Sequence, residues 1–215
     1  MEDVLTRRRV QLGLGLGLLA LALAIGALVA WGPDPTALDR WWNGLIAETR
    51  APWLVAVAHG LDRVGGGVIG VWIAPVLIAA AVTALRGWRT GVFAIAAFAF
   101  SAGLVQILKH LFARARPEDL MVTSDFGSFP SGHTANAATI AVVLWLLFPR
   151  VAVLVAGIAW TVLMGFSRTV VAAHWTTDTL AGAVLGVAAA LLCGAALLAW
   201  SRPRAPGERR AEGSG

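Results

Sequence analysis

Long apolar stretches alternate with short polar segments along the chain. A helix needs roughly 20 apolar residues to cross about 30 Å of hydrocarbon, and several of these stretches approach that length. The pattern therefore predicts an all-α, polytopic membrane protein in which six transmembrane helices form one bundle. The predicted spans are residues 10–31, 68–85, 91–112, 134–148, 151–166 and 179–200.

The fourth and fifth apolar stretches are short for full spans, and only Pro149 and Arg150 separate them. This dipeptide fits either a tight turn between two helices or a kink within one long helix. Short cytoplasmic loops collect Lys and Arg, and the basic residues favour six spans with both termini in the cytoplasm. The arginines assigned to that side are Arg7, Arg8, Arg9, Arg86, Arg89, Arg150, Arg202, Arg204, Arg209 and Arg210.

The segment 32–67 is too polar to cross the membrane and is rich in tryptophan. We interpret it as a short interfacial segment of one or two helices after the first span, because Trp rings favour the head-group region. The tryptophans concerned are Trp41, Trp42 and Trp53. His59 and Asp62 are interpreted as surface polar groups, and the glycine run at 65–67 as a hinge before the second span.

The composition agrees with a membrane protein and excludes a soluble globular domain. Hydrophobic residues make up 58% of the chain and charged residues 13%, and the mean hydropathy is +0.76. Arginines in cytoplasmic loops explain most of the net charge of +5, so no nucleic-acid partner is expected. Cys193 is the only cysteine, which leaves no disulfide framework.

One membrane domain is expected over residues 1–200, followed by a cytoplasmic tail at 201–215 that is disordered by composition. The N-terminal segment has two interpretations, a cleaved signal peptide or a retained membrane anchor. Its apolar run is longer than the roughly 7–15 residues of a signal peptide, which favours the anchor.

Four basic residues near the predicted external face are not explained by cytoplasmic loops: Lys109, Arg114, Arg116 and Arg168. They lie in or beside three polar stretches, KHLFARARP (109–117), FPSGHTAN (129–136) and SRTVVAAHWTTD (167–178). Each stretch adjoins the external end of a predicted span, so one pocket can hold their polar groups. These groups are Lys109, Arg116, Ser131, His133, Arg168, His174 and Asp178. We assign no role to Arg114 and interpret it as flanking charge.

Such a set of side chains suits a phosphate group. Three fixed cations match the charge of a phosphate dianion, and the arginine forks bind its oxygens in bidentate fashion. Ser131 and Gly132 stand where a helix begins, so their backbone N–H groups and the helix dipole would add donors to the same anion. The three stretches together predict an anion-binding site.

The two histidines add acid–base and nucleophilic chemistry. His174 and Asp178 are spaced i, i+4, which places them on one face if the helix has begun by His174. The carboxylate would then hold one ring nitrogen and leave the other aimed at phosphorus. His133, protonated, would supply a proton to the leaving oxygen.

Each residue also has an ordinary structural explanation. Lys109 and Arg116 can be snorkelling charges at a helix end. Ser131 can be an N-cap and His133 a satisfied polar residue, while His174 and Asp178 can be a packing pair. Ionisable residues at membrane depth are costly and usually mark function, so the set as a whole favours a site.

The motifs K-x6-RP, PSGH and SR-x5-H-x3-D, in this order, resemble the three signature motifs of the type-2 phosphatidic acid phosphatase superfamily. They cover residues 109–178 without a departure at any motif position. The matching residues are Lys109, Arg116, Pro117, Pro130, Ser131, Gly132, His133, Ser167, Arg168, His174 and Asp178.

The resemblance implies a metal-independent phosphatase that needs no cofactor and works by double displacement. It implies that His174 attacks and becomes phosphorylated, that Asp178 orients it, and that His133 protonates the leaving group and later activates water. It also implies a clamp on the phosphoryl oxygens, formed by Lys109, Arg116, Ser131, the Gly132 amide and Arg168.

The resemblance extends to the bacterial membrane lipid phosphatases, and the expected partners are a lipid phosphate and the bilayer. The expected substrate is undecaprenyl or another polyprenyl diphosphate, with phosphatidylglycerophosphate second, cleaved at the extracytoplasmic side of the plasma membrane. Alternatives are a phosphotransferase of the same superfamily, a vanadate-dependent haloperoxidase-like enzyme and a catalytically silent membrane scaffold or transporter. The haloperoxidase-like enzymes are soluble, unlike this chain. The oligomeric state is not predicted.

Overall fold

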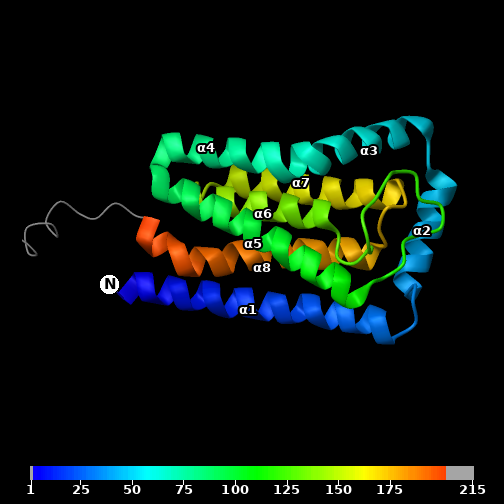
Figure 1. The fold of residues 1–215 in the computed structure, drawn as a ribbon, viewed down its shortest axis with the longest axis horizontal. Helices are drawn as coiled ribbons and strands as arrows, with labels where there is room; N and C mark the ends of the chain where they lie inside the picture. The colour runs from blue at the N-terminus through cyan, green and yellow to red at the C-terminus, as the bar shows by residue number, and fades with distance from the viewer. Residues whose placement is uncertain (1, 202–215) are drawn as a thin grey trace, which may run out of the picture.

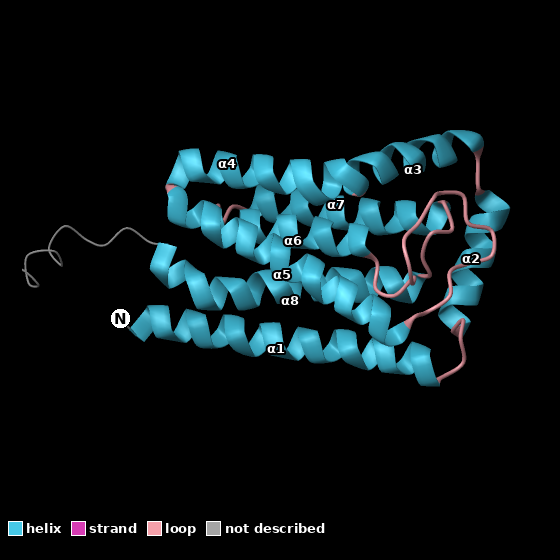
Figure 2. Ribbon diagram, viewed as in Figure 1, coloured by secondary structure: helices cyan, strands magenta, loops and turns pink. Residues whose placement is uncertain are grey.

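The computed structural model describes the backbone of residues 2–201 and the side chains of residues 5–198. All regular secondary structure in this part of the chain is helical (Figure 2). The elements are α1 (Glu2–Trp31), α2 (Ala37–Thr49), α3 (Pro52–Gly65), a π-helical turn η1 (Ile69–Ile73), α4 (Ala74–Arg86), α5 (Trp88–Phe112), α6 (Gly132–Leu147), α7 (Val151–Val170) and α8 (Thr176–Ser201). The predicted tail at 201–215 lies outside the described residues except for Ser201.

Among the described residues, five helical segments are long and apolar enough to cross a membrane, which confirms a multi-pass helical membrane protein. They are Leu5–Trp31, Ile69–Arg86, Trp88–Phe112, Val151–Val170 and Thr176–Leu198. The predicted fourth span corresponds to Gly132–Leu147, which is apolar but has only 16 residues. A sixth crossing and the cytoplasmic position of both termini therefore stay predictions.

The junction at Pro149 and Arg150 is a turn between two helices, not a kink. α6 ends at Leu147 and α7 begins at Val151, and the two helices pack against each other. Their contact is close, because a Cβ at Gly157 would come within 2.7 Å of the Ala141 Cβ. The small side chains let the two helices lie side by side after so short a turn.

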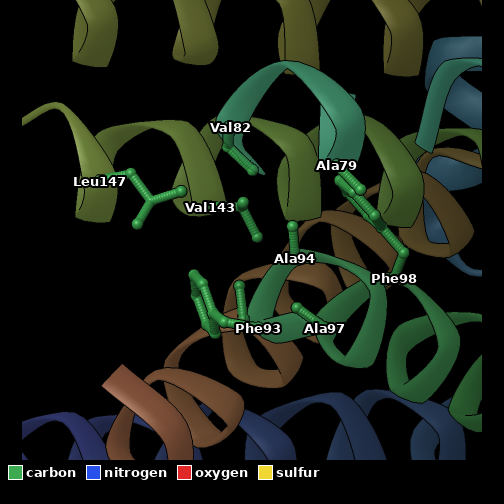
Figure 3. Packing of buried hydrophobic residues seen from close by; sticks show 9 residues of the cluster. Ala79, Val82, Phe93, Ala94, Ala97, Phe98, Val143 and Leu147 are labelled. Atoms are coloured by element: carbon green, nitrogen blue, oxygen red, sulfur yellow. The ribbon is translucent and has the colours of Figure 1, made fainter. Parts of the chain in front are cut away.

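Buried apolar side chains join the helices into one bundle. Figure 3 shows a cluster in which α4, α5 and α6 meet. Its labelled residues are Ala79, Val82, Phe93, Ala94, Ala97, Phe98, Val143 and Leu147. α1 packs along α8, where a Cβ at Gly15 would lie 2.8 Å from the Leu192 Cγ.

The polar connections that contain the three motifs gather at one end of the bundle. In Figure 1, α2 and the long loop between α5 and α6 lie at the right-hand end, opposite the N-terminus of α1 and the α4–α5 turn. The α7–α8 turn at 171–175 reaches the same end, since Met121 N donates to Val171 O at 3.0 Å. The predicted convergence of the three stretches is thus present in the fold.

The segment 32–67 forms two helices, as one of the sequence alternatives held. Trp41 and Trp53 are 62% and 68% exposed, as expected for rings at a membrane interface. Trp42 differs, because its Nε1 donates to Thr169 Oγ1 at 3.0 Å and its ring packs with the core cluster at the end of α7. Trp42 is therefore partly buried on the inner face of α2, and its place at the head-group level stays a prediction.

Candidate active site

Two polar groups of residues form at the motif end of the bundle. The first surrounds His174 and contains Lys109, Arg116 and Asp178. The second joins His133 and Arg168 through Asp62 of α3. Backbone hydrogen bonds connect the segments of the site, from Ala173 N to Arg168 O and from Ser131 N to Asp178 O, both at 3.0 Å.

Lys109 and Arg116 are drawn together by the loop that follows α5. That helix ends at Phe112, and the next residue, Ala113, has a left-handed conformation with φ of 45°. Lys109 Nζ donates to Asp125 Oδ1 at 2.8 Å and to Gly127 O at 2.9 Å. Arg116 Nη2 donates to the same two oxygens at 2.9 and 2.7 Å. The predicted pairing of these cations in one site is therefore present, although the loop residues that join them carry no motif.

The Ser128 carbonyl fixes the orientation of His174. Ser128 is held in turn by its N–H, which donates to Arg114 O at 2.9 Å, and by its hydroxyl, which donates to Ala115 O at 2.9 Å. His174 Nδ1 lies 2.7 Å from Ser128 O. Because a carbonyl only accepts, Nδ1 must carry the hydrogen, which leaves the lone pair on Nε2. Arg116 Nη1 lies 3.5 Å from that Nε2.

His174 is held in its neutral form. Burial lowers the pKa of its imidazole to about 4, and the nearby charges of Arg116 and Lys109 act in the same direction. Asp178 opposes the shift without cancelling it. At neutral pH the ring therefore keeps the lone pair that nucleophilic attack requires.

Asp178 lies beside His174 but does not make the predicted hydrogen bond. Its Oδ2 is 3.7 Å from His174 Nδ1, beyond hydrogen-bond range. The condition behind the prediction is not met, since α8 begins at Thr176, after His174. Asp178 Oδ2 instead accepts from Trp175 N at 2.9 Å, at the start of α8. The carboxylate acts on His174 as a nearby charge, and Ser128 holds the ring.

Arg114, interpreted from the sequence as flanking charge, is a buried hub, so that interpretation was wrong. It is 5% exposed and donates to Asp34, Asp39, Thr177 and Asp178. The distances from its terminal nitrogens to Asp39 Oδ2 and Thr177 Oγ1 are both 2.7 Å. Burial lowers the pKa of the guanidinium, but the three carboxylates outweigh it and raise the pKa above its ordinary value.

Sequence reasoning missed Asp34 and Asp39 because their partner is remote. They lie 80 and 75 positions before Arg114 in the chain. The one local signal was a capping box, in which Thr36 and Asp39 bond each other's backbone N–H at the start of α2. That motif marks a helix start and says nothing about a tertiary partner.

His133 and Arg168 share Asp62, which sequence reasoning had taken for a surface residue. Arg168 is fully buried, and its Nη1 donates to Asp62 Oδ1 while Nη2 donates to Ala58 O at 3.1 Å. His133 Nε2 lies 3.3 Å from the same Oδ1. The hydrogen bond with His133, followed by the bond and charge of Arg168, lowers the pKa of Asp62 to about 2 despite burial. The interpretation of Asp62 as a surface group was therefore wrong.

The glycine run at 65–67 allows α3 to approach His133. A Cβ at Gly66 would overlap the His133 ring, and one at Gly65 would overlap the Met164 side chain. The absence of side chains at these two positions therefore brings Asp62, one turn earlier in α3, within reach of His133.

Ser131 and Gly132 stand at the start of α6, as predicted, but the Ser131 amide is not free. It donates to Asp178 O at 3.0 Å. Ser131 is fully buried, makes no side-chain cap, and its hydroxyl accepts from Thr134 Oγ1 at 3.1 Å. Gly132 is the first residue of α6, where amides lack an intrahelical acceptor. Gly132 therefore fits the predicted donor role better than the Ser131 amide does.

Comparison with known proteins supports the motif assignment. The sequence profile of the PAP2 superfamily matches residues 90–202. Phosphatidylglycerophosphatase B of Bacillus subtilis is 31% identical over 150 residues, 64% of this chain and 72% of that protein. A lipid A 1-phosphatase of Rhizobium johnstonii is 36% identical over 43% of this chain and 42% of its own length. An undecaprenyl-diphosphatase of Sulfolobus acidocaldarius is 32% identical over 47% of this chain and 52% of its own.

The fold is also similar to a solved structure. A transmembrane PAP2-type phosphatidylglycerolphosphate phosphatase from Bacillus subtilis superposes with a TM-score of 0.73 and 26% identity. The match covers 88% of this chain and 98% of that protein. The similarity therefore includes α1–α4 as well as the motif-bearing helices.

Proposed function

Since the chain belongs to the PAP2 superfamily, we propose that it hydrolyses a lipid phosphate through a phosphohistidine intermediate on His174. The observation that carries the proposal is the state of His174. Ser128 O fixes the hydrogen on Nδ1, burial keeps the ring neutral, and Nε2 lies beside Arg116. A phosphate bound by Arg116 would meet a lone pair already aimed at it.

In the first step, His174 Nε2 attacks phosphorus and the bond from phosphorus to the lipid oxygen breaks. The charge that develops on the phosphoryl oxygens is stabilised by fixed cations, which is what phosphoryl transfer mainly requires. Lys109 and Arg116 supply this charge from one side. The Gly132 amide and the positive end of α6 add donors.

The leaving oxygen takes its proton from His133 in the same step. Asp62 orients the His133 ring for this transfer, because its backbone oxygen lies 3.2 Å and its carboxylate 3.3 Å from His133 Nε2. Arg168 bonds the same carboxylate and holds it in place. In this scheme Arg168 both orients Asp62 and adds positive charge to the site.

In the second step, His133 accepts a proton from water and the resulting hydroxide attacks phosphorus. The bond from phosphorus to Nε2 breaks, inorganic phosphate leaves, and His174 returns to its neutral form. Each histidine then has the protonation state with which it began. Asp178 favours the positive charge that His174 carries while it is phosphorylated, although it does not hydrogen-bond the resting ring.

We further propose that this chemistry needs no metal, because cationic side chains supply the charge that a metal would otherwise provide. Activity that survives EDTA unchanged would support this, and a strict requirement for a divalent cation would contradict it. Vanadate is expected to inhibit competitively, because its pentacoordinate form resembles the phosphoryl centre in the transition state.

The site is proposed to face the extracytoplasmic side of the plasma membrane. The support is the arginine content of the opposite end of the bundle, where Arg7, Arg8 and Arg86 lie. Phe126 is 58% exposed in the loop at the site and can be replaced by cysteine. Labelling of Phe126→Cys in intact cells by a membrane-impermeant maleimide, on a Cys193→Ala background, would support this orientation. Labelling only after lysis would contradict it.

The substrate is proposed to be a polyprenyl diphosphate or phosphatidylglycerophosphate, in line with the named relatives. The test is phosphate release by the detergent-purified protein from both lipids, phosphatidic acid, lipid A 1-phosphate and a water-soluble phosphate ester. Wild-type protein and His174→Ala are compared. Release that stops in His174→Ala would support the function. A phosphorylated acceptor, formed without release of inorganic phosphate when an alcohol is added, would indicate the phosphotransferase. Neither product under any condition would indicate a silent scaffold.

A further inference from the structure

One carboxylate in the loop between α5 and α6 occupies the centre of the cationic site. Asp125 Oδ1 accepts from Lys109 Nζ at 2.8 Å and from Arg116 Nη2 at 2.9 Å. These are the two cations that the proposed function assigns to the phosphoryl oxygens. A single oxygen that bridges two such donors has the contacts that a phosphoryl oxygen would make. Asp125 and a bound phosphate therefore compete for the same hydrogens.

The two cations do not need the Asp125 side chain to stay in place. The Gly127 carbonyl accepts from Lys109 Nζ and from Arg116 Nη2, at 2.9 and 2.7 Å. Ala173 O accepts a further hydrogen bond from Arg116 Nη1. Gly127 has φ of +70°, and a Cβ there would lie 3.1 Å from Lys109 O, so the loop backbone itself packs on α5. Backbone oxygens thus fix both side chains independently of the carboxylate.

The Asp125 side chain has room to rotate toward solvent, in contrast to its partners. It is 58% exposed, whereas those of Lys109 and Arg116 are 3% and 11% exposed. Rotation would hydrate the carboxylate and free the hydrogens that both cations donate to it. Partial burial raises the pKa of Asp125, but the hydrogen bond and charge of Lys109 and the charge of Arg116 outweigh it and lower the pKa overall. The group is therefore a full anion at neutral pH.

We propose that Asp125 is an internal competitor that fills the phosphate site when substrate is absent and leaves when substrate binds. The inference rests on the proposed function, since it takes the site as a phosphate site. The membrane surroundings explain why a competing carboxylate would be useful. A site at the membrane face meets phosphodiester head groups at high local concentration, each with one negative charge. A phosphate monoester carries roughly −1.5 to −2 charges at neutral pH.

An anion binds only if its interactions with Lys109 and Arg116 outweigh those of the Asp125 carboxylate that it displaces. A diester head group would replace one negative charge by another and gain little binding free energy. A monoester or diphosphate brings more charge and more acceptor oxygens, so it displaces Asp125 more readily. Asp125 thereby weakens the binding of every anion by the same factor, and a diester that already binds weakly no longer fills the site at its concentration in the bilayer. Apparent affinity for any anion is reduced by the fraction of molecules in which the carboxylate is bound.

The test uses Asp125→Asn, which keeps the shape and removes the charge. Asp119→Asn is the matched control, because Asp119 lies in the same loop and pairs with Arg50 at 2.7 Å, away from Lys109. Inhibition of turnover is measured with inorganic phosphate and with dimethyl phosphate, a soluble diester. Both inhibition constants should fall by roughly three- to tenfold in Asp125→Asn, and by the same factor, because the same displacement precedes both. Neither should change in Asp119→Asn.

Inhibition constants that rise in Asp125→Asn would overturn the proposal and show that the carboxylate positions the cations. Constants that stay the same would overturn it by showing that the carboxylate does not compete. Asp125→Ser serves as a second variant should the first fold poorly. Binding of inorganic phosphate to His174→Ala, with and without Asp125→Asn, separates this inference from the function. Tighter phosphate binding caused by Asp125→Asn, together with a wild-type protein that releases no phosphate from any lipid tested, would uphold the competitor and reject the phosphatase. A wild-type protein that releases phosphate, with phosphate binding unchanged by Asp125→Asn, would uphold the phosphatase and reject the competitor.

Discussion

Replacement of Arg114 by Met should be among the most damaging single substitutions at the motif end of the bundle. Methionine preserves much of the apolar stem but removes the charge. In the native protein, Arg114 bonds Asp39 of α2 and Asp178 of α8, and both carboxylates are fully buried. Asp34 is a third partner, with a side chain that is 31% exposed. The substitution therefore leaves two buried anions without their shared cation.

The two buried carboxylates that lose their partner set the expected loss in free energy of unfolding. Removing one partner of a buried ion pair costs about 3–5 kcal/mol, because the other charge stays buried and uncompensated. Asp34 adds little, since an exposed pair contributes about 1 kcal/mol or less. Thr177 N and its hydroxyl still donate to Asp39, at 2.9 Å from N to Oδ1, which moderates the loss at that carboxylate. The expected destabilisation is therefore about 3–5 kcal/mol.

The assay is reversible unfolding of the purified protein in mixed micelles of increasing denaturing detergent, with phosphate release as a second readout. Asp39→Asn added to Arg114→Met should recover part of the lost stability, because it removes one uncompensated charge. The same Asp39→Asn in the wild-type background should destabilise, because Arg114 then loses a partner. A change below about 1 kcal/mol in Arg114→Met, or no recovery in the double variant, would refute the argument.

Further predictions concern the two histidines and their surroundings. Asp62→Asn should lower kcat by roughly 10- to 100-fold with little change in KM, because His133 and Arg168 lose the carboxylate that they share; an unchanged kcat would remove Asp62 from the mechanism. Gly66→Ala should reduce phosphate release strongly by displacing the His133 ring, whereas Gly60→Ala, where a Cβ meets nothing within 4 Å, should not, and equal effects would contradict the steric argument. The folded pKa of His174, about 4, lies below its ordinary value of 6.5, so the stability it contributes is complete above pH 6.5 and is lost as pH falls toward 4. Unfolding in His174→Ala should show a weaker dependence on pH over that interval, and an identical dependence would count against the burial of a neutral ring.

The parts of the structure that sequence predicted well depend on strong local signals. Apolar stretches long enough to span a bilayer identify the helices. Consecutive spans run in opposite directions, so the end of one span and the start of the next lie at the same face. These two signals alone predict that the motifs at residues 109–117, 129–136 and 167–178 lie together. Helix ends were less accurate. α7 continues to Val170, past the predicted end at 166, because Ser167 and Arg168 are buried and bonded within the bundle.

The parts that sequence did not predict depend on tertiary contacts. Arg114 gains its importance from Asp34 and Asp39, which belong to a different part of the chain. Ser128 holds His174 through a backbone carbonyl, and every residue type offers that group, so no residue pattern marks it. In the sequence, Asp62 is an ordinary polar residue of a surface helix. Its role depends on Gly66, whose lack of a side chain lets α3 pack against His133.

The central claim is that a phosphoryl group passes through His174, and trapping of that intermediate tests it most directly. Purified protein is mixed with a lipid substrate labelled in the terminal phosphate, quenched in base within milliseconds, and digested for mass spectrometry. The account predicts label on the peptide that contains His174, decaying at the rate at which inorganic phosphate appears, and no label in His174→Ala. Phosphate release without a labelled protein species, or normal release by His174→Ala, would contradict it.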